Sequence, residues 1–223
     1  MTINNAGAIA GYYQTPSGAT YGFLYQNGAY TTLDPFGSSN VSIFGIDARG
    51  NVIGSFNIEN AQGQSAVYGF VYGQLTGYQV LSDPHSLLPN GLPDTDGFGL
   101  NASGVAIGDY FGPGPHAFFG GQYDGYVYQD GNYTTINPPT SFRTTPLAID
   151  DAGDIVGNYV AFDTFQGYGF EAIPTSSVPE PATWAMLLAG IFGAGAMVRF
   201  ARRSTNKAAR ASVASQQEAR RAS

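Results

Sequence analysis

Few residues in this chain have the types and spacing that catalysis requires. There is no cysteine, and the two histidines, His85 and His116, lie in segments rich in proline and glycine. A metal site or a hydrolase triad needs a histidine with partners at a suitable spacing, and neither histidine has them. We therefore interpret both as histidines of surface loops, and we predict no catalytic residues, no metal site and no cofactor.

The acidic residues form two local patterns. The segment 94–97 (Asp-Thr-Asp-Gly) opens like a calcium loop but lacks the later ligands and the closing glutamate. Asp94 and Asp96 could also serve as a carboxylate pair for glycoside hydrolysis, but nothing in the sequence selects them from the 16 acids of the chain. A second cluster, Asp150, Asp151 and Asp154, lies in a turn, where capping of the backbone is favoured over calcium binding.

Tyrosines are the other candidates for binding, because exposed rings can stack on sugar faces. Five tyrosines at repeat positions could lie on an exposed rim: Tyr12, Tyr13, Tyr30, Tyr78 and Tyr133. Rings that recur with a strand pattern more often fill the space between structural units. Core packing is therefore the favoured interpretation, and ligand binding is the alternative.

A different signal lies near the C-terminus. Val178, Pro179, Glu180 and Pro181 form an extended break, because each proline fixes φ and lacks an amide hydrogen. The next 17 residues, 182–198, carry no charge, which is the short end of what spans a ~30 Å hydrocarbon layer. A basic stop follows at Arg199, Arg202 and Arg203, and the positive-inside bias places it in the cytoplasm. The sequence predicts a transmembrane helix over 182–198 and a basic, disordered tail over 199–223.

These three parts together resemble the PEP-CTERM sorting signal of exopolysaccharide-producing Gram-negative bacteria, over residues 178–203. The resemblance implies that an exosortase-type membrane protease or transpeptidase recognises the Pro-Glu-Pro motif, cuts near it, and releases or re-anchors the N-terminal domain. The same tail is also labelled the C-terminal domain of ice-binding proteins, which implies nothing about ice. The chain departs from the family by continuing for 20 residues after Arg203. The alternative is an ordinary single-pass anchor or a buried hydrophobic helix.

Charge divides the chain at the same place. Before residue 182 the basic residues are Arg49 and Arg143, against 15 acids, so this part has a net charge of −13. The remainder has a net charge of +6. An acidic domain disfavours nucleic acid, whose phosphates need lysine and arginine.

An internal repeat organises residues 1–173. An apolar residue, Asn or Asp, two variable positions and Gly recur from Ile3, Ile46, Leu100 and Ile149. This pattern predicts a turn, and a second glycine four residues later lies in a strand, where it permits close approach of a backbone or ring. Each unit continues to a strand such as 21–25 (Tyr-Gly-Phe-Leu-Tyr), whose rings share one face. Asn27-Gly28 and Asp130-Gly131 predict two-residue hairpins.

Units of about four short strands, spaced by 43, 54 and 49 residues, are typical of β-propeller blades. The pattern also resembles the HAF extracellular repeat. We predict an all-β, propeller-like array of about 3.5 four-stranded repeats over 1–173, with a linker over 174–181. A β-sandwich or an open stacked array is the alternative. The first unit starts at its turn with no strand or signal peptide before it, so we expect further upstream sequence; a small array exported by another route is the alternative.

These features predict a protein of the cell envelope or extracellular space, first anchored in the inner membrane with its N-terminal domain outside. We expect a structural or adhesive role in an exopolysaccharide or biofilm matrix, and no enzymatic activity. The expected partners are the exosortase-type enzyme, the membrane and exopolysaccharide, but not nucleic acid. A carbohydrate-binding propeller module is the alternative, and a glycan-active enzyme is less favoured.

Overall fold

The computed structural model describes residues 1–38, 40–113 and 121–174. This part of the chain is all-β, with a single three-residue 3-10 helix, Pro35–Gly37, as its helical element. The strands are β1 (Thr2–Ile3), β2 (Ile9–Gln14), β3 (Thr20–Gln26), β4 (Ala29–Leu33), β5 (Val41–Ile46), β6 (Val52–Glu59), β7 (Ser65–Gly73), β8 (Gly77–Leu81), β9 (Thr95–Leu100), β10 (Ala106–Gly112), β11 (Gln122–Gln129), β12 (Asn132–Ile136), β13 (Ser141–Ile149), β14 (Ile155–Ala161) and β15 (Gly167–Ala172). The predicted all-β class is confirmed.

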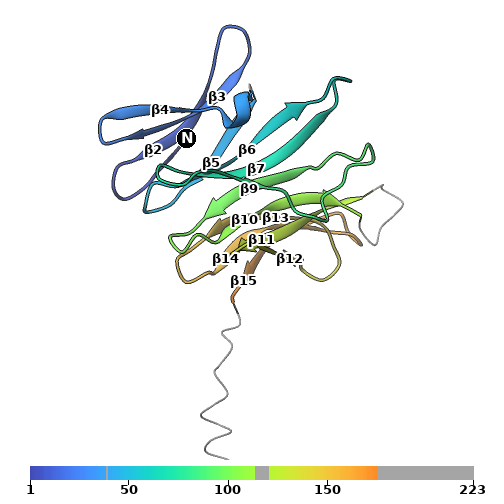
Figure 1. Cartoon of the computed structure of the whole chain (residues 1–223). Helices are drawn as coiled ribbons and strands as arrows, with labels where there is room; N and C mark the ends of the chain where they lie inside the picture. Colours follow the sequence, from blue (N-terminus) through green and yellow to red (C-terminus); the bar gives the residue numbers. More distant parts are fainter. Residues whose placement is uncertain (39, 114–120, 175–223) are drawn as a thin grey trace, which may run out of the picture. The chain divides into compact units, whose positions relative to one another are not determined.

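Consecutive antiparallel strands build the sheets (Figure 1). Strands β1–β4 form one four-stranded sheet and β5–β8 form another. The other seven strands belong to one sheet, but β11 and β13 meet in one parallel pair, Tyr123 with Arg143. Isolated parallel bridges lie at the two earlier junctions, Thr20 to Asn40 and Val67 to Asp94. We therefore term β1–β4, β5–β8, β9–β12 and β13–β15 the first to fourth repeats.

One turn chemistry recurs in all four repeats. Asn4 Oδ1 accepts hydrogen bonds from the amides of Ala6 at 3.0 Å and Ala8 at 2.9 Å, and Gly7 has a φ of 78°. Asp47, Asn101 and Asp150 each accept two amides in the same way. A glycine is needed at the left-handed position because a Cβ is strained there. Asp150 is thus a turn-capping residue, as predicted.

The hairpin and strand-glycine predictions are also confirmed. Asn27 and Gly28 have φ values of 54° and 79°, which is the pair of positive angles that a type I′ turn requires. Asp130 and Gly131 repeat this geometry, with 51° and 86°. At the strand glycine Gly157, an added Cβ would lie 2.6 Å from the ring of Phe170. The glycine therefore leaves the room that a neighbouring ring occupies.

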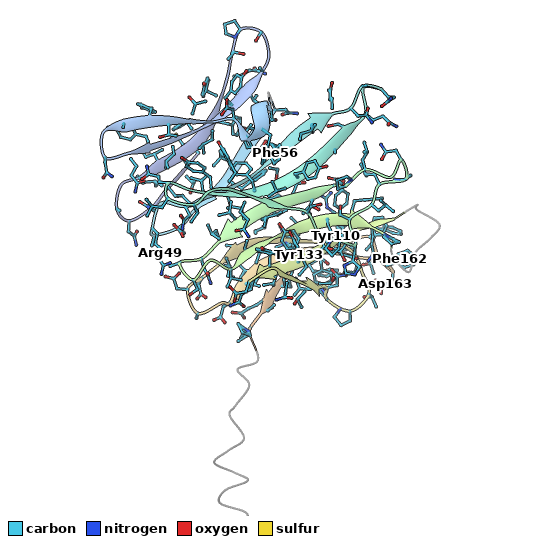
Figure 2. All side chains as sticks on the ribbon, in the orientation of Figure 1. Arg49, Phe56, Tyr110, Tyr133, Phe162 and Asp163 are labelled. Atoms are coloured by element: carbon cyan, nitrogen blue, oxygen red, sulfur yellow. The ribbon has the colours of Figure 1, made fainter. Side chains whose placement is uncertain are left out.

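Side chains alternate between two faces of each repeat. One face, termed the ring face, carries the aromatic residues of the second to fourth strands; in the second repeat these are Phe56, Tyr68, Phe70, Tyr72 and Tyr78. The opposite, aliphatic face of the first repeat carries Ala10, Leu24 and Leu33. These two faces pack together in one apolar cluster, and Figure 2 shows Phe56 there. Burying a ring of this size stabilises the fold by about 1.5–3 kcal/mol.

One local expectation was wrong. The first unit does have a strand before its turn, because Thr2 and Ile3 pair with Ala10 and Ile9 as β1. Residues 95–97, whose sequence opens like a calcium loop, belong to β9 and pair with β10.

The C-terminal predictions fall outside the described residues. They are the Pro-Glu-Pro motif at Val178, Pro179, Glu180 and Pro181, the basic stop at Arg199, Arg202 and Arg203, and the helix over 182–198. In the described part of the chain, no helix is long and apolar enough to cross a membrane.

Candidate functional site

A row of carboxylates lies where the third repeat meets its neighbours. Asp96 on β9 and Asp109 on β10 are register partners, so their side chains emerge from adjacent strands. Asp109 is only 1% exposed, and its Oδ2 accepts a hydrogen bond of 3.1 Å from the Thr145 hydroxyl on β13. Asp94 is also buried. The three carboxylates therefore lie on or beside strands of the third repeat, and the fourth repeat contributes the Thr145 hydroxyl.

Burial makes these carboxylates hard to ionise. It raises the pKa of Asp109 to about 7, with the nearby Asp96 charge adding to the effect. The pKa values of Asp94 and Asp96 are also raised, chiefly by burial. Arg143 opposes the shift at all three. The row can consequently gain or lose a proton near neutral pH.

Tyr123 links the row to its one positive side chain. Its hydroxyl donates to Asp94 Oδ2 at 2.9 Å, and the Arg143 guanidinium lies 4.8 Å from the centre of its ring. Burial raises the pKa of Tyr123, so the hydroxyl stays protonated and remains a donor. Arg143 itself is exposed, so the row reaches solvent at this end.

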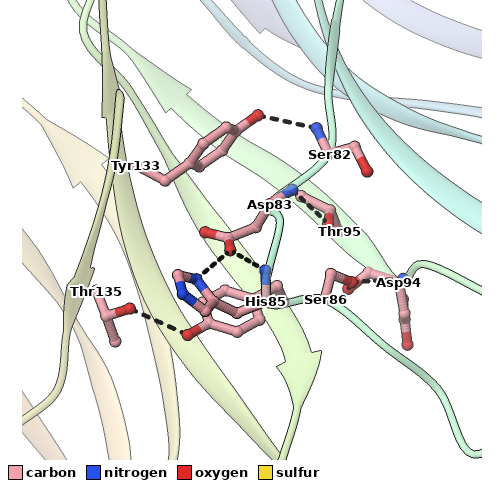
Figure 3. A network of polar contacts seen from close by, with 9 residues as sticks. Ser82, Asp83, His85, Ser86, Asp94, Thr95, Tyr133 and Thr135 are labelled. Atoms are coloured by element: carbon pink, nitrogen blue, oxygen red, sulfur yellow. Dashed lines mark hydrogen bonds and ion pairs between the residues drawn. The ribbon is translucent and has the colours of Figure 1, made fainter. Parts of the chain in front are cut away.

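A second polar network lies beside the row (Figure 3). Asp83 has a fully buried side chain, and its Oδ1 lies 3.0 Å from Nδ1 of His85, whose side chain is 67% exposed. The hydroxyl of Ser86 donates to the Asp94 carbonyl at 2.8 Å, which ties the network to the start of β9. His85 is thus a surface histidine, as expected, but one that a buried carboxylate orients. His116 lies outside the described residues.

Three buried polar atoms in the described part of the chain have no hydrogen-bond partner. They are Asp83 Oδ2, Gln122 Oε1 and Thr144 Oγ1. No group of three or more His, Asp or Glu side chains among residues 1–38, 40–113 and 121–174 is placed to hold a metal ion.

The structure brings together Asp94 and Asp96, the pair weighed in the sequence, but the sequence interpretation missed Asp109. The position after the strand glycine is Ser55 in the second repeat and Asn158 in the fourth. A carboxylate at this position of the third repeat was the available signal. Its burial could not be inferred without knowing how the repeats stack.

The second candidate surface is the ring face of the first repeat: Tyr13, Tyr21, Phe23, Tyr25 and Tyr30. The rings form close pairs, with centroids 4.6 Å apart for Tyr25 and Tyr30 and 5.9 Å apart for Tyr13 and Tyr21. Tyr30 is 75% exposed and Tyr13 is 43% exposed. This face carries no charged side chain, so it is an open aromatic surface.

The matching tyrosines of later repeats are covered. Tyr78 and Tyr133 occupy the position of Tyr30, and their hydroxyl oxygens accept hydrogen bonds from the preceding repeat, from the amides of Asp34 at 3.1 Å and Ser82 at 2.8 Å. Burial raises the pKa of each to about 12. Core packing is therefore confirmed for these two tyrosines, whereas Tyr12, Tyr13 and Tyr30 are exposed.

When the chain is compared with protein-family models and with curated proteins, none of them matches.

Proposed function

We propose that this chain is an exported or cell-surface β-repeat protein with a structural or adhesive role in an exopolysaccharide or biofilm matrix. The observation that carries this proposal is the open ring face of the first repeat. An uncharged surface of paired rings suits adhesion, because aromatic side chains provide large contact area at a low conformational cost. We propose no catalytic role.

The repeats are proposed to be blades of a propeller-like array. Each repeat is an antiparallel meander of up to four strands, and its first strand lies beside the preceding repeat. The parallel contacts that join successive repeats recur at the same place, at residues 40, 94 and 143. This regular stacking is what propeller blades require.

The sorting part of the proposal rests on the residues between 178 and 203. An exosortase-type membrane enzyme is the proposed partner, Pro179, Glu180 and Pro181 are its proposed recognition motif, and the basic stop is proposed to hold 182–198 in the inner membrane. The acidic domain would then face the outside of the cell.

Export is tested by fractionating cells that carry the full gene and an exosortase. We expect the parent domain outside the cytoplasm, and Glu180→Ala to fold but remain unprocessed at its larger size. A conservative control, Glu171→Gln, should mature like the parent. A domain found only in the cytosol would contradict the export proposal, and a Glu180→Ala protein of mature size would contradict the sorting motif.

A second candidate function is carbohydrate binding by the same face. The paired rings favour it, because sugars stack on exposed aromatic faces. Polysaccharide pull-down by the full chain, compared with Tyr13→Ala and Tyr30→Ala, tests it. Leu75→Ala is a matched control, since this apolar side chain is exposed but lies in a distant turn. Equal retention of all four proteins would remove the carbohydrate role.

A further inference from the structure

Successive repeats contact each other in the same way, and the contact lies at the glycine of the third strand. On the aliphatic face, an added Cβ at Gly22 would lie 3.0 Å from Ile43 of the second repeat. At Gly69 it would lie 3.2 Å from the Gly97 amide nitrogen of the third repeat, and at Gly125 it would lie 2.9 Å from Pro146 of the fourth. Each of these glycines therefore forms a seat for the first strand of the following repeat.

The fourth repeat has the same glycine, but no strand of the described residues lies on it. Gly169 aligns with Gly22, Gly69 and Gly125 in the repeat. Among the described residues, the nearest atom to an added Cβ is the Gly157 carbonyl oxygen at 3.9 Å. On the same face Val156 is 48% exposed. This face therefore shares the strand glycine of the three others, although it lacks their fourth strand, and no residue of the described part of the chain covers it.

The first repeat has the opposite deficiency. Its ring face has the same pair of tyrosine rings that, in the second repeat, packs on the aliphatic face of the preceding repeat. The ring centroids of Tyr25 and Tyr30 are 4.6 Å apart, and those of Tyr72 and Tyr78 are 4.9 Å apart. The equivalent pair of the third repeat is 4.8 Å apart. Because Tyr30 is exposed, these rings are preformed, and within the described residues no other repeat lies against them.

The polar groups of the two faces are compatible. Glu171 occupies the position that Leu24 and Val71 hold in earlier repeats, so the open aliphatic face has one carboxylate. A ring-face tyrosine already forms a hydrogen bond with a polar side chain of the preceding aliphatic face, because Gln79 donates to the Tyr128 hydroxyl at 2.6 Å. A tyrosine hydroxyl of the first repeat can likewise donate to Glu171, because the phenol is a donor at neutral pH.

We infer that the ring face of the first repeat in one copy of this chain docks on the aliphatic face of the fourth repeat in a second copy. This names the partner of the adhesive face, so it rests on the proposed function of that face, but it does not depend on export. The contact is head-to-tail. Such contacts generate closed rings when the rotation closes and filaments when it does not.

The test uses the full chain in a mild detergent, with its protein mass measured by analytical ultracentrifugation at about 10–100 µM, where a micromolar contact is populated. Tyr30→Arg blocks the ring face, and Gly169→Arg blocks the aliphatic face. Both positions are open to solvent, so neither change needs to disturb the fold; circular dichroism verifies this. Leu75→Arg is the matched control, since the residue is fully exposed in a turn.

We expect the parent and Leu75→Arg to form dimers or larger assemblies, and each blocked variant alone to be a monomer. A mixture of the two blocked variants should restore dimers but nothing larger. The intact ring face of Gly169→Arg can dock on the intact aliphatic face of Tyr30→Arg, and the other two faces are blocked. Parent protein that stays monomeric would overturn the inference. So would a Gly169→Arg variant that still dimerises, because the ring faces would then pair with each other. All variants share one tail, so association through the tail would leave every mass unchanged and would also overturn it.

Discussion

The junction between the first and second repeats and the junction between the third and fourth repeats have the same strand geometry but opposite chemistry. The first is filled by apolar side chains, including Leu24, Val41 and Phe70. The other contains Asp109 and Thr145, and the fully buried Thr144 has an unpartnered hydroxyl. The backbone turns and glycines fix how repeats stack, and the side chains between them are then free to serve stability in one place and polar chemistry in another.

This difference has an energetic consequence. A carboxylate whose pKa is raised to about 7 by burial reduces stability at neutral pH, because the folded state must either keep a proton or bury a charge. Such groups occur most often where a protein binds or reacts. The apolar junction should therefore carry the stability, and the polar junction should set its pH dependence.

The largest expected effect is at the apolar junction. Phe70 is 0% exposed within the cluster, so Phe70→Ala should reduce the free energy of unfolding by about 3–5 kcal/mol. Phe44→Ala in the same repeat is the control, because this ring is 45% exposed and its loss should cost about 1 kcal/mol or less. Chemical denaturation followed by circular dichroism measures both. Equal losses would show that the buried rings do not hold this junction.

The next largest effect is the pH dependence of stability that the polar junction causes. The folded-state pKa of Asp109 is about 7, above the reference value of 3.8. As pH rises through this window the unfolded chain releases the proton first, so the Asp109 contribution makes the parent less stable from about pH 4 to pH 7 and constant above that. Asp109→Asn removes the titration, so its stability relative to the parent should increase over this window by on the order of 3 kcal/mol.

The check on this prediction is a pair of denaturation series at pH 4.5 and pH 8. Asp130→Asn, in an exposed hairpin turn, is the matched control and should follow the parent at both values. If the difference between Asp109→Asn and the parent were the same at the two pH values, the buried carboxylate would not titrate as proposed.

The smallest effect compares equivalent tyrosines. Tyr133→Phe leaves the Ser82 amide without its 2.8 Å partner, so it should cost about 1 kcal/mol of stability. Tyr30→Phe removes an exposed hydroxyl and should change stability by less than about 0.5 kcal/mol. The same pair of denaturation curves tests both, and a cost at position 30 equal to that at 133 would mean that the first ring face is already covered.

The strand order, turns and strand glycines could be predicted because their signals are local. Asn4, Asp47, Asn101 and Asp150 cap their own turns within four residues, so the pattern in the sequence is the pattern in the structure. The carboxylate row could not be predicted in this way. It joins Asp96, Asp109 and Thr145 from three strands, and their proximity depends on the stacking of repeats.

The tyrosines show the same limit. Tyr30, Tyr78 and Tyr133 occupy one repeat position, so the sequence predicts the same packing role for all three. Within the described residues, only Tyr78 and Tyr133 pack on another repeat. A repeat pattern therefore predicts what each ring face is built to do, but not whether that face is covered.

The central claim is that the open ring face of the first repeat is the working surface of an exported protein. The most direct measurement is the amount of mature protein in the extracellular matrix fraction of exosortase-positive cells, for the parent, Tyr30→Arg and Leu75→Arg. We predict that all three are exported, that the parent and Leu75→Arg remain in the matrix, and that Tyr30→Arg is released into the medium. Retention of Tyr30→Arg in the matrix at the parent level would contradict the claim.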